Sequence, residues 1–211
     1  MARVDELNNL RSMPYEEYFG EMELADEEKE KRIELAERLE PHFLFLFAIV
    51  GISTADYMKE MLNRRYTDTV SEFFGDEVTE DSYMGLYIRR ITSNIVDVTI
   101  QHTPTDTSLL TAADAYYTSA DRAIFLSENE SNAVSNYYLQ LDAIKAGFTK
   151  KTWITMRDRK VRHTHVEVDS ETIGIFQPFT VGNSLMMFPK DASLGADDKE
   201  IVNCRCSLHY S

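Results

Sequence analysis

The chain has 211 residues, of which 43% are hydrophobic and 11% aromatic, and its formal net charge at pH 7 is −14. This composition can form a core and excludes an intrinsically disordered chain, and the acidity argues against a protein that wraps nucleic acid regardless of sequence. Two cysteines are too few for a disulfide scaffold.

The start of the chain, MARVDELNNLRSM, lacks the apolar core of a secretory signal. The longest apolar run, residues 43–52 (FLFLFAIVGI), is ten residues long, whereas a membrane-spanning helix needs about 20. We therefore expect no membrane span and a protein made in a reducing cytoplasm. The run itself predicts a buried core helix, with a stripe that docks a partner as the alternative.

The first half of the chain predicts helices. Residues 26–40 carry acids early and apolar residues at helical spacing, which is typical of a helix that begins with acidic residues. Pro41 is expected to kink or restart this helix. Thr54 is expected to cap the next helix, which ends before a loop near Gly75.

Two further helices are expected before the sequence changes from a helical to a strand-like pattern. The first covers about residues 83–98, where apolar residues recur at three- and four-residue steps until Pro104 breaks the pattern. The second runs from about Ser119 to Ala146, and Gly147 ends it.

The segments after Gly147 are short, rich in β-branched and aromatic residues, and separated by turn-forming residues. The predicted strands are KTWITMRD, HVEVD, ETIGIF, LMMF and NCRCSLHY. The predicted fold class is therefore α+β, with a helical region at 1–147 followed by a small β-rich domain at 148–211 that packs against it.

The two cysteines and two of the histidines form pairs with one intervening residue. In extended strands each pair would face one side, so His163, His165, Cys204 and Cys206 could supply two thiolates and two imidazoles to zinc. Structural zinc sites usually have two to four intervening residues, so we expect no metal and no other cofactor, and the quartet is kept as the alternative. A disulfide between Cys204 and Cys206 would close a strained, very small ring.

A catalytic alternative also exists in the C-terminal domain. His165, Arg157 and Asp158 could serve as a general base and charge clamp in a small ribonuclease-like sheet. No phosphate-binding glycine loop and no serine elbow accompany them. We therefore expect no catalytic residues.

Basic residues gather at the start of the C-terminal domain. Within 13 residues stand Lys150, Lys151, Arg157, Arg159, Lys160 and Arg162, with Asp158 as the only acid. This basic cluster is either a solvated strand and turn or a face that docks an acidic protein or a nucleic-acid backbone.

A series of motifs in the last part of the chain, about residues 120–208, resembles the C-terminal domain of phage head morphogenesis proteins, the Mu F-like minor head family. That family has a Trp after a Lys-rich entry, an Asp-x-x-x-Arg stretch, a His before a Leu-Asp-Gly turn, a Pro-Phe, a Pro-Gly-Asp-Pro and an Asn-Cys-Arg-Cys. The matching residues here are Lys150, Lys151, Trp153, Asp158, Arg162, His165, Asp169, Pro178, Phe179, Pro189, Asp191, Ser193, Asn203, Cys204, Arg205 and Cys206.

Several positions depart from the family pattern. Ser170 stands where the turn has Gly, and Lys190 and Ala192 replace the Gly and the second Pro of Pro-Gly-Asp-Pro. The family also has an Arg-Thr-Glu on its last helix, of which only Glu130 is present here.

The resemblance implies a non-enzymatic minor head protein of the virion that acts at the portal in head morphogenesis or DNA delivery. Its partners would be the portal protein and the major capsid or scaffolding protein, with weak or no direct DNA binding. It would be located in the head near the portal, and in the host cytoplasm during assembly. His165, Cys204 and Cys206 would then hold a small sheet together, and Arg205, on the opposite face, would pair with an acid such as Asp158. The alternative is a small nuclease-like or toxin-like enzyme that uses His165 and Arg157.

Overall fold

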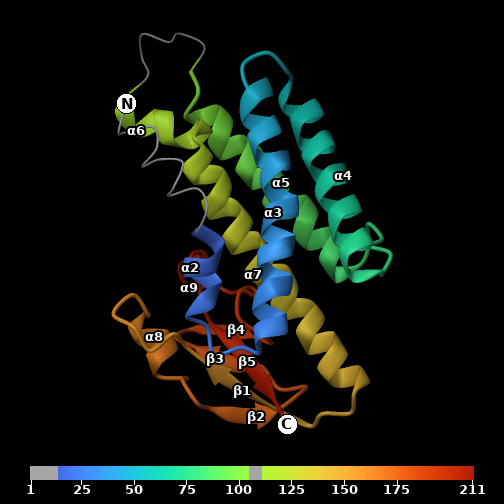
Figure 1. The fold of residues 1–211 in the computed structure, drawn as a ribbon, viewed down its shortest axis with the longest axis vertical. Helices are drawn as coiled ribbons and strands as arrows, with labels where there is room; N and C mark the ends of the chain where they lie inside the picture. Colours follow the sequence, from blue (N-terminus) through green and yellow to red (C-terminus); the bar gives the residue numbers. More distant parts are fainter. Residues whose placement is uncertain (1–13, 105–110) are drawn as a thin grey trace. The chain divides into compact units, whose positions relative to one another are not determined.

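The computed structural model of the chain describes residues 14–104 and 111–211 (Figure 1). The helices are α2 (Pro14–Gly20), α3 (Asp26–Ile49), α4 (Ala55–Phe74), α5 (Tyr83–Gln101), α6 (Ala112–Ala115), η2 (Tyr116–Thr118), α7 (Ala120–Lys145), α8 (His163–Val166) and α9 (Asp198–Ile201). The strands are β1 (Lys150–Ile154), β2 (Thr172–Gly174), β3 (Phe179–Val181), β4 (Ser184–Met186) and β5 (Ser207–Tyr210). Helices followed by antiparallel strands confirm the predicted α+β class.

The described chain divides into two compact units. We call Glu34–Ser127 the helical unit, and the residues up to Ile33 together with Glu128–Ser211 the mixed unit. These bounds differ from the predicted division into 1–147 and 148–211. The second part of α7 belongs with the strands because its Asn132 and Asn136 side chains bind loops of the C-terminal segment. The start of α3 joins them because Arg32 binds these two side chains.

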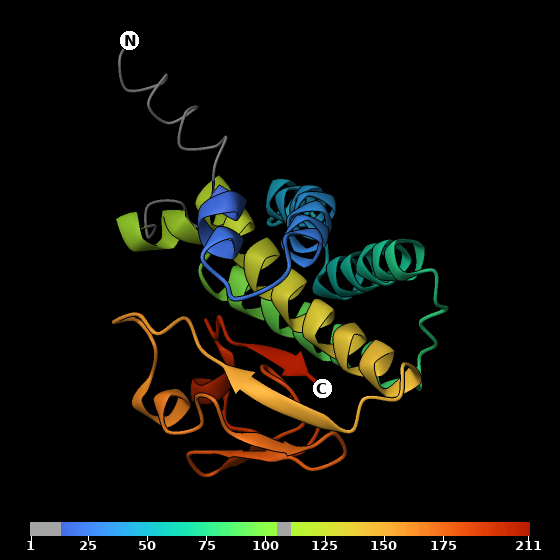
Figure 2. The same ribbon diagram turned by 60° about the horizontal axis from the view of Figure 1, so that its bottom comes forward.

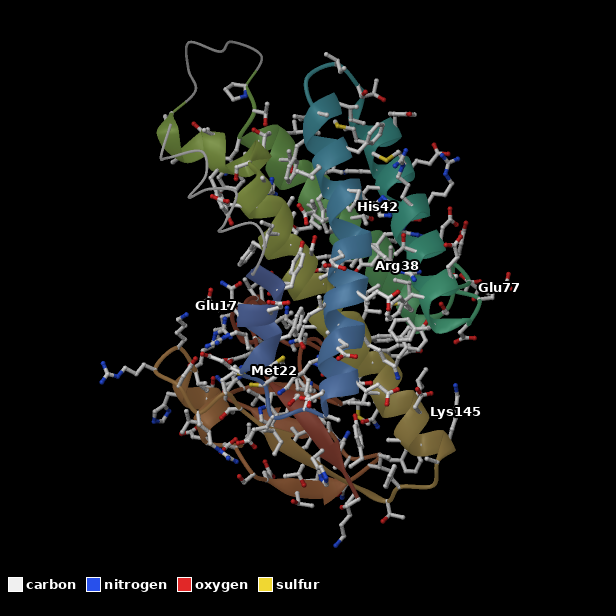
Figure 3. The ribbon with its side chains drawn as sticks, in the orientation of Figure 1. Glu17, Met22, Arg38, His42, Glu77 and Lys145 are labelled. Atoms are coloured by element: carbon white, nitrogen blue, oxygen red, sulfur yellow. The ribbon has the colours of Figure 1, made fainter. Side chains whose placement is uncertain are left out.

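In the helical unit, α4 and α5 lie against each other (Figure 1). The predicted cap is present, since the Thr54 hydroxyl accepts a hydrogen bond from the Tyr57 amide, and Gly75 ends α4 with a φ of 64°. His42 and Arg38, labelled in Figure 3, project from α3 toward α4. There His42 Nε2 lies 2.8 Å from Thr69 Oγ1. This contact joins α3 to α4.

The apolar run at residues 43–52 lies mostly within α3. Phe43, Leu46 and Phe47 are buried in the helical unit, as expected for a core helix, whereas Ile52 beyond the helix end is 82% exposed. Pro41 lies inside α3, so the predicted restart of the helix is wrong. Within the described residues, no helix combines the length and the apolar character needed to cross a membrane.

The mixed unit contains two small sheets. Strand β1 is central in an antiparallel sheet of order β2-β1-β5, and β3 and β4 form a hairpin. Figure 2 shows β1 and β5 side by side, with Trp153 opposite Leu208. Trp153 and Phe179 are fully buried, and their rings meet edge to face at 5.2 Å. Truncating either ring to Ala should therefore cost about 3–5 kcal/mol.

Two predicted strands are wrong. The segment HVEVD forms no strand, because His163–Val166 is the single-turn helix α8, followed by a turn. In NCRCSLHY, only Ser207–Tyr210 is a strand, and the cysteines lie in the segment before it. Two valines in the first segment and an aromatic residue in the second favoured strands, but in the structure tertiary contacts decide the local conformation.

Candidate functional site

A buried cluster of His165, Cys204 and Cys206 lies in the mixed unit. His165 Nδ1 is 3.3 Å from Cys206 Sγ and 3.6 Å from Cys204 Sγ. The three donor atoms lie within 4.8 Å of one another, and all three residues are buried. Both cysteines are free thiols. We call these residues the His–Cys cluster.

Local backbone geometry aims these side chains at one point. The single turn of α8 directs His165 inward, where its ring meets the Trp153 ring edge to face at 5.7 Å. Cys204–Cys206 is not a regular strand, yet its side chains alternate: both thiols reach His165, while Arg205 turns away. Arg205 Nη2 lies 2.5 Å from Asp158 Oδ2, which confirms the predicted pair.

The second ring nitrogen of His165 faces a carboxylate. Nε2 is 3.2 Å from Glu200 Oε2, close enough for an ion pair although the contact lacks the angles of a hydrogen bond. Glu200 is itself buried and accepts a hydrogen bond of 2.7 Å from the Thr164 hydroxyl. The imidazole is thus held between two sulfurs on one side and a carboxylate on the other.

The two thiols affect each other's pKa. Burial raises the pKa of Cys204, but hydrogen bonds from Cys206 and His165 outweigh it and place the pKa of Cys204 below its usual range. The hydrogen bond to Cys204, together with burial, raises the pKa of Cys206. The nearby Trp153 indole N–H acts on the pKa of Cys206 in the opposite direction. A thiolate in this cluster would therefore reside on Cys204.

His163 does not join the cluster. Its side chain is 88% exposed and its Nδ1 lies 3.3 Å from Glu167 Oε1. The prediction that His163 and His165 face one side is wrong, because they lie on a helical turn and not on a strand. The proposed quartet of metal ligands is therefore reduced to three residues.

A small recess adjoins the cluster. Its volume is about 10 Å³, and it is lined by Met156, Lys160, Val161, Arg162, His165, Asn203, Cys204, Arg205 and Cys206. Arg157 is not among these residues, and neither is Asp158. The catalytic trio of the alternative prediction is therefore not gathered around this recess.

Helix α7 carries a buried row of amide side chains that sequence reasoning missed. Asn132 Nδ2 donates to Cys204 O at 3.0 Å, and Asn136 Nδ2 donates to Pro189 O and Cys206 O at 3.3 Å each. Gln140 Nε2 donates to Ile175 O at 3.0 Å. We call Asn129, Asn132, Asn136 and Gln140 the amide row. The row pairs the backbone carbonyls of loops that would otherwise be buried without partners.

A buried arginine supports the amide row from α3. Arg32 is fully buried, its Nη1 donates to Asn132, and its Nη2 donates to Asn136 Oδ1 at 3.0 Å. Burial lowers the pKa of Arg32 to about 10. The Ser131 hydroxyl donates to Arg32 O at 2.6 Å. The spacing of three and four residues in the amide row was visible in the sequence, but such a polar stripe usually marks a solvated face.

Lys190 is another buried cation of the mixed unit. Its Nζ donates to Asn129 Oδ1 at 2.7 Å and to Asn129 O at 3.0 Å. Burial lowers the pKa of Lys190 to about 8, and the charge of Glu130 partly opposes this shift. Glu130, the remaining acid of the family's helix motif, is thus part of the buried polar network.

The basic cluster is only partly a surface. Lys151 is fully buried, its Nζ donates to Met187 O at 2.6 Å, and burial lowers its pKa to about 8, so its assignment to a docking face is wrong. Arg157 is exposed but paired, with Nη1 2.7 Å from Glu23 and Nε 2.9 Å from Asp169. Arg162 donates to Val202 O. Lys150, Arg159 and Lys160 remain as exposed cations.

The other motif residues make loop contacts. Asp169 Oδ1 accepts hydrogen bonds from the Thr155 amide at 2.8 Å and the Thr155 hydroxyl at 3.0 Å. Asp191 is buried and accepts from the amides of Met187 and Ser193, both at 2.8 Å. Pro189 is buried and Pro178 is exposed, while the Asn203 amide donates to Asn129 Oδ1 at 3.2 Å.

Comparisons with known proteins identify no relative of this chain. No protein-family model matches the chain, and neither the curated proteins nor the solved structures gave a match.

Proposed function

We propose that this chain is a non-enzymatic minor head protein of a phage, acting at the portal in head morphogenesis or DNA delivery. The proposal rests on the motif resemblance. The observation that carries it is the backbone conformation at the positions where the chain departs from the family pattern. The comparisons with known proteins neither favour nor oppose it.

Ser170 and Lys190 stand where the family has glycine, and both have a positive φ, 66° and 72°. Asn203, which begins the Asn-Cys-Arg-Cys motif, has a φ of 58°. Among the described residues only one other non-glycine residue, Arg157, has a positive φ. A left-handed backbone favours Gly and, to a lesser degree, Asn. At both positions where this chain lacks the family's glycine, the backbone therefore has a conformation that glycine adopts readily.

The contacts of the motif residues favour a structural role. Trp153 packs on Phe179, His165 lies against both cysteines, and Asp158 pairs with Arg205. These residues come from distant parts of the sequence, and their side chains are directed at one another. Such an arrangement stabilises a loop-rich domain, and a scaffold for other proteins requires a stable domain.

No observation favours the enzyme alternative enough to propose it. His165 is 1% exposed, and Arg157 is engaged by Glu23 and Asp169. A general base must come within hydrogen-bonding reach of a substrate proton, and burial keeps His165 from one in this conformation.

The proposed partner is the portal protein, with the major capsid or scaffolding protein as further contacts, and the proposed place is the head near the portal. The net charge of −14 disfavours direct DNA binding. The test is co-purification of the tagged chain with the portal protein encoded in the same phage genome, with and without nuclease treatment. Nuclease-resistant association, together with the chain in purified heads, is expected. Heads that assemble and deliver DNA normally without the chain would contradict the proposal.

A further inference from the structure

The two nitrogen–sulfur separations of the His–Cys cluster are those of a metal site. In tetrahedral zinc sites, Zn–S is about 2.3 Å and Zn–N about 2.0–2.1 Å, which separates a sulfur from a nitrogen ligand by about 3.6 Å. His165 Nδ1 lies 3.3 Å and 3.6 Å from the two sulfurs. The third separation, between the two sulfurs, is within 4.8 Å, so all three donor atoms can approach one ion.

The surroundings of His165 supply a second, independent indication. A histidine that ligates a metal usually donates its other ring N–H to a carboxylate, which fixes the ring and its tautomer. Here Nδ1 faces the sulfurs, while Nε2 faces Glu200 at 3.2 Å, and Thr164 holds that carboxylate in place. A histidine with only a packing role has no need of this arrangement.

The charges and the space also fit. Two thiolates neutralise the charge of a divalent ion, so the loaded site would bury no net charge of its own, which is the requirement in a low-dielectric interior. All three ligands line the recess of about 10 Å³, and a single water needs about 10–15 Å³. A water molecule in the recess could complete a tetrahedron.

We propose that His165, Cys204 and Cys206 bind one Zn²⁺, with a water molecule from the recess as the fourth ligand. Glu200 acts as a positioning residue through His165. The ion ties α8 to the segment that leads into β5, and thiolate and imidazole ligands select Zn²⁺ over Mg²⁺ or Ca²⁺. The one-residue spacing within each pair led to the expectation that no metal binds, and this inference reverses it. Spacing along the sequence does not show how close His165 lies to the cysteines in the fold. It does not depend on the proposed function.

The test measures metal bound by the full chain, purified under reducing conditions without chelator. Elemental analysis should give about one Zn²⁺ per chain. Cys204→Ser and Cys206→Ser should reduce zinc to background. His163→Gln is the matched control and should keep the full amount, because His163 is exposed and lies outside the cluster. Glu200→Gln should weaken zinc affinity by about 10–100-fold, as measured by competition with a chelator.

Binding of Co²⁺ to the wild-type chain provides a spectroscopic measurement that does not depend on whether the variants fold. The chain has two cysteines, so a sulfur-to-cobalt charge-transfer band in wild-type protein can arise only from Cys204 and Cys206. We expect that band together with the visible bands of four-coordinate Co²⁺. A folded, reduced wild-type chain that takes up neither Zn²⁺ nor Co²⁺ would overturn the proposal. So would a metal content that is unchanged when both cysteines are replaced.

Discussion

Arg205 Nη2 lies 2.5 Å from Asp158 Oδ2 and joins the segment before β5 to the turn after β1. The pair is only partly exposed, with 14% of the Arg205 side chain and 31% of the Asp158 side chain accessible. Arg205 stands between the two cysteines in an extended segment, where successive side chains point to opposite sides. Because both thiols point to His165, the Arg205 side chain points away from it.

This pair should show a measurable coupling. In a double-mutant cycle of Arg205→Ala and Asp158→Ala, we expect an interaction free energy of about 1 kcal/mol, at the upper end for ion pairs near a surface. The measurement is the free energy of unfolding from urea titrations. The control pair is Lys145 and Asp142, 3.6 Å apart and about 70% exposed, for which about 0–0.3 kcal/mol is expected. Equal couplings for the two pairs would contradict the assigned role.

The amide row should be a large contributor to stability. Asn136→Ala leaves the carbonyls of Pro189 and Cys206 and one guanidinium nitrogen of Arg32 without their partner. Because unpaired buried polar groups are costly, we expect a loss of about 2–3 kcal/mol in the free energy of unfolding. Asn94→Ala, at an exposed position of α5, is the control and should change stability by less than about 0.5 kcal/mol. Similar effects of the two substitutions would argue against the amide row.

The contrast between α5 and α7 shows what the sequence could predict. Residues 83–98 have an apolar period, so the helix was predictable from spacing. Its buried face was predictable only in part, because Tyr87 and Ile95 of the apolar stripe are buried whereas Leu86 is 53% exposed. In α7 the helix was predictable but its buried amides were not. Asn and Gln have the same spacing whether they face water or a loop. The carbonyls that pair them come from residues 35 to 72 positions away.

The His–Cys cluster was half predictable for the same reason. The alternation of Cys204, Arg205 and Cys206 is local, and its consequence for Arg205 could be read from the sequence. The placement of His165 depends on a single helical turn, which is too short to have a periodic signal. Glu200 comes from a four-residue helix, α9, and nothing in its local sequence links it to a histidine 35 positions earlier.

Asp169 should make the mixed unit sensitive to acid. Burial raises the pKa of Asp169, but hydrogen bonds from Thr155 and Arg157 outweigh burial and hold it below the usual range. Since the folded-state pKa is below the unfolded value of about 3.9, the carboxylate stabilises the fold above about pH 4. That stability is lost as the pH falls through the folded-state pKa. The difference between urea midpoints at pH 7 and pH 3 should be smaller in Asp169→Asn than in wild type.

Arg157→Gln provides the complementary measurement. It removes the guanidinium whose Nε donates to Asp169 Oδ2 at 2.9 Å and keeps the hydrogen bonds from Thr155. The acid sensitivity of Arg157→Gln should therefore be smaller than that of wild type but larger than that of Asp169→Asn. An unchanged acid sensitivity in Asp169→Asn would show that this carboxylate is not the group that titrates.

Ser170→Gly should stabilise the protein. Ser170 has a φ of 66° and is exposed, and a left-handed conformation costs a non-glycine residue about 1–2 kcal/mol. After allowance for the greater entropy of an unfolded glycine, about 0.5–1 kcal/mol, we expect a gain of up to about 1 kcal/mol in the free energy of unfolding. Ser193→Gly, an exposed position without a positive φ, is the control and should be neutral or destabilising.

Lys190→Gly separates backbone strain from side-chain contacts. Lys190 also has a positive φ, 72°, but its buried ammonium donates twice to Asn129. Relief of strain is therefore offset by the loss of both hydrogen bonds and by the space left behind. We expect a net destabilisation, in contrast to Ser170→Gly. A gain in both variants would mean that the Asn129 contacts contribute little.

The exposed part of the basic cluster should govern electrostatic docking. Lys150, Arg159 and Lys160 are exposed on a chain with a net charge of −14. Steering by opposite charges acts mainly on the association rate and weakens with salt. Replacing all three by Ser should slow association with the proposed partner, the portal protein, by about tenfold at low salt and flatten the salt dependence of the rate. Surface plasmon resonance at two salt concentrations measures both effects.

The control for this variant is Lys151→Ser. Lys151 belongs to the same run of bases but is buried, with its ammonium 5.4 Å from the centre of the Phe179 ring and bonded to Met187 O. Its replacement should lower the free energy of unfolding by about 2 kcal/mol, because it empties a buried site and leaves a carbonyl unpaired. The triple variant should keep the wild-type stability, since exposed substitutions rarely change it by more than about 0.5 kcal/mol. If the folded triple variant associates at the wild-type rate at both salt concentrations, these three residues are a solvated surface and docking depends on another face.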